Sequence, residues 1–384
     1  MMSEKEQLSK VIDWLRFPLM VMVVMIHVSL CKEMDYSLPI NEMPISAVIW
    51  YLLAHGICWA AVPTFFFISG YLFFYDTQNG VNPNRGGYYL KKLRKRFYSI
   101  FIPFIIASIT FLTCHYGLLV IRAYQTGDTI PSMIDVLREH GWLKVFWNNN
   151  RLGEVNQAAM TNILGITMHK SFPLLTPMWY LRDLMVVVIL APIIHLFVTK
   201  TKLFGLGIVS VLYLLNIWIP IEGFSVSAFF FFSLGAYLSL FNKNILIEFG
   251  KYKYLFYVIA IVSLILMLIS HGQNRYLEEI FVNIYRIAGV ISFFNIAGLL
   301  VAKDKVRIPK LLTQSSFFIY LVHFIYITGL AGVVVTKLLP YDNQFIILFN
   351  YFLTVLVTIA ICVLLYIIMR RLCPKLLSVI VGGR

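Results

Sequence analysis

The chain has 384 residues, of which 60% are hydrophobic and 13% are charged, and its mean hydropathy is +0.80. Soluble domains carry about 25% charged residues, so this composition excludes an ordinary soluble protein. The formal net charge of +14 suggests nucleic-acid binding at first sight. The basic residues, however, are spread over the loops between apolar segments instead of forming one patch. We therefore interpret them as a signal of membrane topology and expect no nucleic-acid partner.

Apolar segments long enough to cross a bilayer recur along the whole chain. They predict an all-α fold, namely a polytopic membrane helical bundle with about ten transmembrane helices. We expect a single integral-membrane domain over residues 1–384 without a fused soluble domain. The expected spans are residues 11–31, 45–74, 97–121, 178–198, 203–221, 224–242, 253–271, 279–302, 312–336 and 345–370.

The loops on one side of these spans hold most of the 32 Lys and Arg residues. Cytoplasmic loops are enriched in basic residues, so we expect both termini to face the cytoplasm. One loop on the opposite side, at about 122–177, is long. A long loop with its own sequence pattern can be a lid, a binding element or a mobile surface loop, and these interpretations stay open.

Two ionisable residues, Arg16 and His27, lie in the first apolar span. Each costs roughly 2.5 kcal/mol or more at the centre of a bilayer, which makes both candidates for a functional site. Their spacing returns the two side chains to nearly one helix face, roughly 16 Å apart along the axis. His27 could act as a general base, and Arg16 could orient a ligand or pair with Asp13. The alternatives are snorkelling for Arg16 and an interhelical hydrogen bond for His27.

The second span contains Ser69 and Tyr71 on either side of a glycine, and small residues there let a neighbouring helix approach closely. The loop after this span ends in a basic run that includes Arg94, Lys95 and Arg96. Such a run suits the phosphates of an anionic donor such as a coenzyme. Anchoring at the cytoplasmic surface or binding of lipid head groups is the alternative.

Trp179, Arg182 and Asp183 stand at the start of the fourth span. A cation and a carboxylate beside an aromatic residue are compatible with an acceptor site at the outer surface. The alternative is a Trp of the interfacial aromatic belt next to a local ion pair.

The late spans carry three more candidates. Arg286, in the eighth span, is a cation that needs a partner, and Glu278, Glu279 or a ligand phosphate could supply it. Tyr320 and His323 are three residues apart in the ninth span, so they share a helix face. His323 is a second intramembrane histidine, which favours a functional interpretation.

Patterns for metal or serine-hydrolase chemistry are missing from the sequence. It has no HExxH motif and no paired-carboxylate spacing, and its five cysteines form no CxxC pair. We therefore predict no metal site. Ser69 is not part of a G-x-S-x-G motif, which argues against a serine hydrolase.

Four segments, in this order, resemble the acyltransferase-3 family of bacterial integral-membrane O-acyltransferases, over about residues 13–325. Arg16 followed by His27 resembles the first-helix signature of that family. Residues 65–71 and the basic run after them resemble its second-helix motif. Residues 178–184 resemble its Trp-Phe-Leu segment, and residues 316–323 resemble its late Ser-x-x-Ile-Tyr-x-x-His segment.

The resemblance implies transfer of an acyl group, mostly acetyl, from cytoplasmic acyl-CoA to a hydroxyl group of a cell-envelope glycan. It implies acyl-CoA, with acetyl-CoA as the simplest case, as donor substrate and an envelope glycan or glycolipid as acceptor. The expected location is a bacterial cell membrane, with membrane lipids as further partners.

We assign roles to the candidate residues on this basis. His27 deprotonates the acceptor hydroxyl, and Arg16, held by Asp13, orients the donor or supports developing charge. A covalent acyl-histidine intermediate is an equally open route. The donor-binding candidates are Arg94, Lys95, Arg96, Ser69, Tyr71 and Arg286, and the acceptor-side candidates are Trp179, Arg182, Asp183, Tyr320 and His323.

Two other function classes stay open at this point. A transporter or flippase for a glycan or small metabolite would also need intramembrane Arg, His and Asp residues, because such residues build proton relays. A non-catalytic partner in an envelope polysaccharide assembly is a third, less favoured interpretation.

Overall fold

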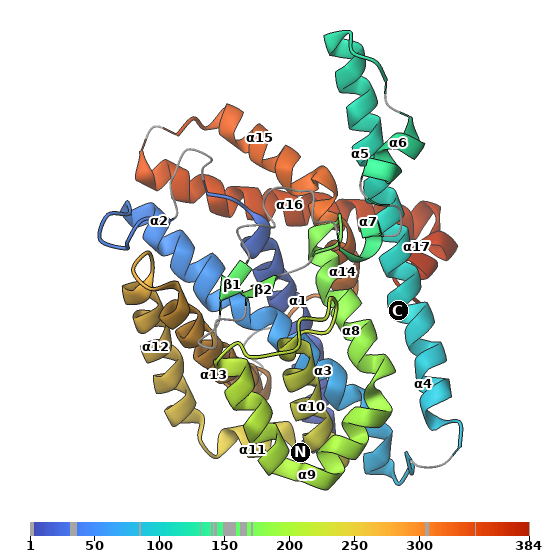
Figure 1. Ribbon diagram of the computed structural model, residues 1–384, viewed down its shortest axis with the longest axis vertical. Helices are drawn as coiled ribbons and strands as arrows, with labels where there is room; N and C mark the ends of the chain where they lie inside the picture. The colour runs from blue at the N-terminus through green and yellow to red at the C-terminus, as the bar shows by residue number, and fades with distance from the viewer. Residues whose placement is uncertain are drawn as a thin grey trace.

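A computed structural model describes residues 4–30, 37–83, 86–130, 132–139, 141, 144–148, 159–161, 167–169, 172–303, 307–341 and 343–383. In these ranges the chain is an all-α, multi-pass bundle (Figure 1), as the sequence predicts. The exception is a small antiparallel hairpin of β1 (Ala159–Thr161) and β2 (Thr167–His169), in which Met160 pairs with Met168. This hairpin belongs to the predicted long loop.

The described residues contain seventeen α-helices. They are α1 (Glu4–His27), α2 (Ile45–Trp50), α3 (Ala61–Phe74), α4 (Tyr88–Arg96), α5 (Ile102–Thr126), α6 (Met133–Glu139), α7 (Lys144–Trp147), α8 (Trp179–Ile189), α9 (Ala191–Leu214), α10 (Val226–Leu240), α11 (Ile245–Gly250), α12 (Lys253–Ser270), α13 (Arg275–Ala302), α14 (Lys310–Val322), α15 (Thr328–Leu338), α16 (Gln344–Leu372) and α17 (Pro374–Ile380). Three π-helical stretches lie between α-helices. Tyr51–Gly56 follows α2 on the way to α3, Phe97–Phe101 joins α4 to α5, and His323–Ile327 joins α14 to α15.

Seven helical stretches in the described ranges are long and apolar enough to cross a membrane. They are Ile45–Asn79, Tyr88–Thr126, Ala191–Leu214, Lys253–Ser270, Arg275–Ala302, Lys310–Leu338 and Gln344–Leu372. The other three predicted spans fall on α1, which carries Lys10, Asp13 and Arg16, on α8 with 11 residues, and on α10 with 15 residues. Length and composition therefore support a multi-pass protein, and the number ten stays a prediction.

The boundary between the fourth and fifth predicted spans coincides with a break inside α9. Lys202 has φ 52° and ψ −134°, which no α-helix accommodates, so α9 consists of two limbs. Backbone bonds from Leu190 N to Val186 O and from Ile194 N to Leu190 O continue α8 into the first limb. The predicted span 178–198 is therefore formed by two helical pieces, namely α8 and the first limb of α9.

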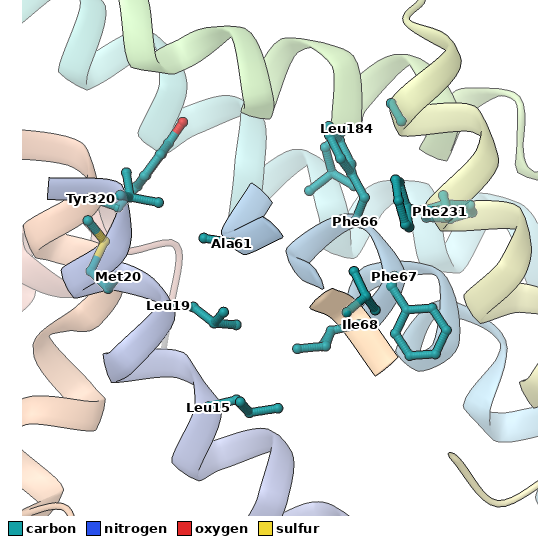
Figure 2. Close-up of a cluster of buried hydrophobic side chains, with 14 of the residues drawn as sticks. Leu15, Leu19, Met20, Ala61, Phe66, Phe67, Ile68, Leu184, Phe231 and Tyr320 are labelled. Carbon is teal, nitrogen blue, oxygen red and sulfur yellow. The ribbon is translucent and has the colours of Figure 1, made fainter. Parts of the chain in front are cut away.

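The centre of the bundle is an apolar cluster to which α1, α3 and α10 contribute. Figure 2 shows Leu15 and Leu19 pointing from α1 toward α3, whose Phe66 and Phe67 lie toward Phe231 of α10. These five side chains are all almost inaccessible to solvent. Burial of such large side chains at several helix contacts fixes how α1 sits in the bundle.

Two glycines allow α3 and α10 to touch along their backbones. A Cβ atom at Gly70 would lie 2.0 Å from the Phe232 carbonyl oxygen, and one at Gly235 would lie 2.1 Å from that of Phe67. No side chain fits at such distances, so this crossing depends on both glycines. The close helix approach predicted at Ser69-Gly70 is therefore confirmed.

Candidate functional site

α1 carries its charged pair on a face that is not covered by other helices. Arg16 Nη1 lies 3.0 Å from Asp13 Oδ1, and the two side chains are about half exposed. The predicted pairing is thus present, one helical turn apart. The opposite face of α1 is apolar and buried through Leu8, Val11 and Leu15. This amphipathic pattern holds the Arg16 guanidinium at the surface of the bundle.

A small groove of about 120 Å³ runs beside this pair, between α1 and α3. α1 contributes Asp13 and Arg16 to its lining, and α3 contributes Tyr71. The Tyr71 hydroxyl accepts a hydrogen bond from Gln78 Nε2 at 3.1 Å, which fixes the phenol ring. The groove is smaller than the 300 Å³ or more of common small-molecule pockets. It is therefore too small to enclose a whole ligand of that size.

His27 is the last residue of α1, and two side chains from other elements hold this end of the helix. Tyr351 Oη donates to the Met25 carbonyl at 3.0 Å, and Trp50 Nε1 donates to the Val28 carbonyl at 3.3 Å. The last carbonyls of a helix lack intrahelical partners, so these bonds satisfy groups that would otherwise be unpaired. They also fix the direction in which α1 presents His27.

The His27 ring meets His323. Its centroid lies 5.4 Å from that of His323, with 40° between the ring planes, and 5.0 Å from that of Phe324, edge to face. The first and ninth predicted spans are thus brought together at their histidines, because α1 packs against α14. His27 is partly exposed, whereas His323 is completely buried.

His323 stands at the point where the helix of the ninth span changes its geometry. Its Nδ1 lies 3.0 Å from the Ile319 carbonyl oxygen and 2.9 Å from the Tyr320 carbonyl oxygen. Because carbonyl oxygens only accept hydrogen bonds, Nδ1 carries the proton. Nε2 is buried and has no hydrogen-bond partner among the described residues.

The π-helical stretch His323–Ile327 follows at once. Ile325 and Tyr326 leave helical geometry, and Tyr326 has a positive φ of 59°. Thr328 Oγ1 donates to the His323 carbonyl at 2.8 Å. The Tyr326 ring stacks on Phe111 at 5.4 Å. A π-helical break of this kind inside a helix occurs frequently at functional sites.

Tyr320 and Trp179 belong to an aromatic cluster between α14, α8 and α3. Tyr320 Oη donates to the Pro177 carbonyl at 2.5 Å, and its ring meets that of Tyr180 edge to face at 5.8 Å. Phe66 of α3 contacts the rings of Trp179 at 6.2 Å and Tyr180 at 4.8 Å. Two predicted acceptor-side residues, Tyr320 and Trp179, therefore lie in one cluster.

The predicted pair Arg182 and Asp183 exists but is directed inward. Arg182 Nη2 lies 2.9 Å from Asp183 Oδ1, and the two side chains are only 4% and 3% exposed. Arg182 Nη1 also donates to the Trp147 carbonyl at 2.6 Å, and the guanidinium lies over the Trp147 ring at 5.7 Å. The pair therefore anchors α7, which is part of the predicted long loop, to the start of α8.

The basic run forms the last turn of α4. Arg94 and Lys95 are exposed, whereas Arg96 is partly buried. Lys92, earlier in the run, is engaged with Asp76 at 2.7 Å. Arg94 and Lys95 can therefore meet an anionic group from outside, and the helix that carries them contacts α8.

Arg286 has protein partners, in line with one of the predicted options. Its Nη1 lies 2.6 Å from Asn283 Oδ1 and 3.7 Å from Glu279 Oε1, and its guanidinium lies over the Trp59 ring at 4.6 Å. Ser69 is partly buried in α3 beside Gly70. Both donor-side assignments remain predictions.

One polar cluster was not predicted from the sequence. Glu278 Oε1 bonds the Tyr51 hydroxyl and lies 3.1 Å from His271 Nδ1, and the ring of Tyr51 stacks on that of His55 at 5.1 Å. The acidic pair that opens the eighth span was the only available signal. Among the described residues, no group of three or more His, Cys, Asp or Glu could hold a metal ion.

Comparison with known protein families matches residues 10–367, nearly the whole chain, to the acyltransferase domain family, acyltransferase-3. Searches of curated proteins and of solved structures found no match. Arg16 and His27, the α3 motif, the start of α8 and the His323 segment all lie inside the matched range. The chain therefore belongs to the acyltransferase-3 family and is a multi-pass membrane acyltransferase.

Proposed function

We propose that this protein transfers an acyl group, most simply acetyl, from acyl-CoA to a hydroxyl group of a cell-envelope glycan. The observation that carries the proposal is the position of His27. Its partly exposed imidazole lies at the fixed end of α1, beside a second histidine. Arg16 and its groove lie on the same helix, roughly 16 Å away along the axis.

The donor side of the reaction is supported by the distribution of cations. Arg94 and Lys95 are exposed at the end of α4, and Arg16 lines the groove with Tyr71. Guanidinium and ammonium groups suit the phosphates of coenzyme A. We propose that these residues hold the nucleotide part, so that an extended pantetheine arm brings the thioester to His27.

The proposed chemistry needs one proton acceptor. His27 takes the proton of the acceptor hydroxyl, and the hydroxyl oxygen attacks the thioester carbonyl carbon. The carbon–sulfur bond breaks, and the departing coenzyme A thiolate receives the proton from His27. Arg16, paired with Asp13, supports the negative charge of the donor. In the alternative route, His27 first takes the acyl group and then passes it to the hydroxyl.

The acceptor side is supported by the aromatic cluster. Trp179 and Tyr320 offer flat apolar rings next to hydrogen-bonding groups, a combination that suits a sugar ring. Arg182 and Asp183 contribute through the position of α7, since their charges are paired. We place the protein in a bacterial cell membrane with both termini in the cytoplasm, on the distribution of its basic residues.

The test uses purified protein in lipid nanodiscs with radiolabelled acetyl-CoA and an envelope glycan extract. We expect release of coenzyme A together with label in the glycan, and loss of both in His27→Ala. His195→Ala is the matched control, because His195 is a partly exposed histidine that contacts Phe74 and Tyr89 in another part of the bundle. Near-normal turnover in a folded His27→Ala protein would contradict the mechanism.

Purified protein reconstituted in liposomes separates the enzyme from a transporter. When the glycan extract is on one side only, an acyltransferase labels the glycan without moving unmodified glycan. Movement of unmodified glycan across the bilayer with no acylation would overturn the proposed function.

Mass spectrometry of envelope glycans from cells with and without the protein would then identify the acyl group and the acceptor together.

A further inference from the structure

We propose that His323 is a positioning residue for His27. In this proposal His323 Nε2 accepts a hydrogen bond from a ring N–H of His27, which fixes the nitrogen of His27 that keeps its lone pair for the acceptor hydroxyl. The inference rests on the proposed function, in which His27 is the base. The inference concerns the contact between His27 at the end of α1 and His323 at the end of α14.

The first argument is the tautomer of His323. Its Nδ1 is within 3.0 Å of two backbone carbonyl oxygens, those of Ile319 and Tyr320. Nδ1 must therefore donate, and in a neutral imidazole the other nitrogen is then an acceptor. A histidine whose one nitrogen is held by the backbone presents its second nitrogen in a fixed direction.

The second argument is the unpaired state of that second nitrogen. Nε2 of His323 is buried and lacks a hydrogen-bond partner within the described part of the chain. A buried acceptor without a donor costs free energy, so a partner that completes the bond is favoured. The ring of His27 is 5.4 Å away, centroid to centroid.

The third argument is the distance itself. A hydrogen bond between two imidazoles, with the nitrogens about 3 Å apart, places the ring centroids about 5 Å apart. The observed separation is therefore close to that of a bonded pair, and a rotation of the His27 side chain can complete it. His27 is partly exposed, whereas His323 is completely buried and held from behind by its own helix.

The fourth argument is the backbone that carries His323. The π-helical stretch begins at this residue, and Tyr326 adopts a positive φ of 59°. Tyr326 is retained there by its stack on Phe111 and by a 2.9 Å contact between its hydroxyl and His115 Nδ1. Strained backbone of this kind persists where neighbours over-determine it, often at functional sites.

Two variants separate positioning from packing. His323→Phe keeps a buried ring next to Phe324 and His27 but has no nitrogen. His323→Gln can place its side-chain oxygen near the position of Nε2, so it keeps the acceptor without the ring. If His323 only fills space, Phe should replace it better than Gln. If it accepts a hydrogen bond, Gln should replace it better than Phe.

The first measurement is acyl-CoA consumption by the full chain in nanodiscs. We expect His323→Phe to lower kcat about 100-fold, with the KM for acetyl-CoA changed less than about twofold. His323→Gln should recover at least about tenfold of that loss. A His323→Phe protein with wild-type kcat, or a His323→Gln protein no better than His323→Phe, would overturn the proposal.

The second measurement does not depend on turnover. In protein labelled with ¹⁵N-histidine, the nitrogen shifts of His27 should report one tautomer in the wild type and a mixture in His323→Phe. Unchanged His27 shifts would overturn the positioning role, even if His323→Phe folds poorly enough to lose activity. Failure of the proposed function is distinguishable, because it would show as no acyl-CoA consumption by the wild type.

Discussion

The imidazole of His27 on α1 lies 5.4 Å from that of His323, at the end of α14, and the two rings differ in what holds them. His323 is held by two carbonyls of its own helix, and His27 is held through the end of α1, which Tyr351 and Trp50 fasten. The His323 ring is thus bonded directly through its Nδ1, whereas the described bonds at His27 hold the helix end and not the ring. The combination suits a base that must receive one proton and return it.

Replacement of Arg16 should weaken donor binding without unfolding the protein. Arg16 is half exposed and forms its ion pair with Asp13, which is half exposed as well, so Arg16→Ala should change the free energy of unfolding by less than about 0.5 kcal/mol. Loss of a charge-assisted contact to a phosphate should raise the KM for acetyl-CoA about tenfold. Lys10→Ala, which removes an equally exposed cation paired with Glu6, is the control. An unchanged KM in Arg16→Ala would contradict the donor assignment.

Replacement of Gly70 by Ala should separate α3 from α10. The new Cβ would lie 2.0 Å from the Phe232 carbonyl oxygen, so the helices must move apart. We expect a loss of about 1–3 kcal/mol, seen as a lower thermal midpoint in detergent. Gly117→Ala in α5 meets no atom within 4 Å and should leave the midpoint unchanged or raise it. Equal midpoints for the two variants would show that the close crossing is not formed.

Removal of Arg182 should release α7 as well as destabilise the bundle. Asp183 would keep a buried charge without its cation, which costs about 3–5 kcal/mol. Backbone amides of residues 144–148 should then exchange with deuterium faster, because the bond to the Trp147 carbonyl is lost. Lys251→Ala, which breaks an exposed pair with Glu248, serves as the comparison and should cost less than about 1 kcal/mol. Protection of residues 144–148 that survives in Arg182→Ala would refute the anchoring role.

The orientation of α4 and α5 can be tested by cysteine labelling. In a variant whose five native cysteines are replaced by serine or alanine, Lys95→Cys and Tyr124→Cys each provide one exposed thiol. If the basic run faces the cytoplasm, a membrane-impermeant maleimide should label Tyr124→Cys in intact cells. Lys95→Cys should react only after permeabilisation. The reverse pattern would place the basic run, and with it the proposed donor side, outside the cell.

Local features of the site could be predicted because they depend on neighbours in sequence. Asp13 and Arg16 pair across one helical turn, and Arg286 finds Glu279 two turns away on α13. The close approach at Gly70 also follows from the absence of a side chain. The family resemblance, carried by motifs on several helices, agrees with the match over residues 10–367.

Contacts between distant segments could not be predicted in the same way. The meeting of His27 with His323 depends on how α1 packs against α14, and periodicity within one helix says nothing about its neighbour. The bond from Arg182 to the Trp147 carbonyl directs a predicted surface pair inward. The π-helical stretch that begins at His323 has the sequence His-Phe-Ile-Tyr-Ile. It contains neither Pro nor Gly, so nothing in the sequence predicts a break there.

The break at His323–Ile327 divides the ninth predicted span into two rods, α14 and α15, instead of one. α15 packs against α16 (Figure 1), while α14 contacts both α16 and α1. The two rods are joined at the buried histidine, because Thr328 at the start of α15 donates to the carbonyl of His323 at the end of α14.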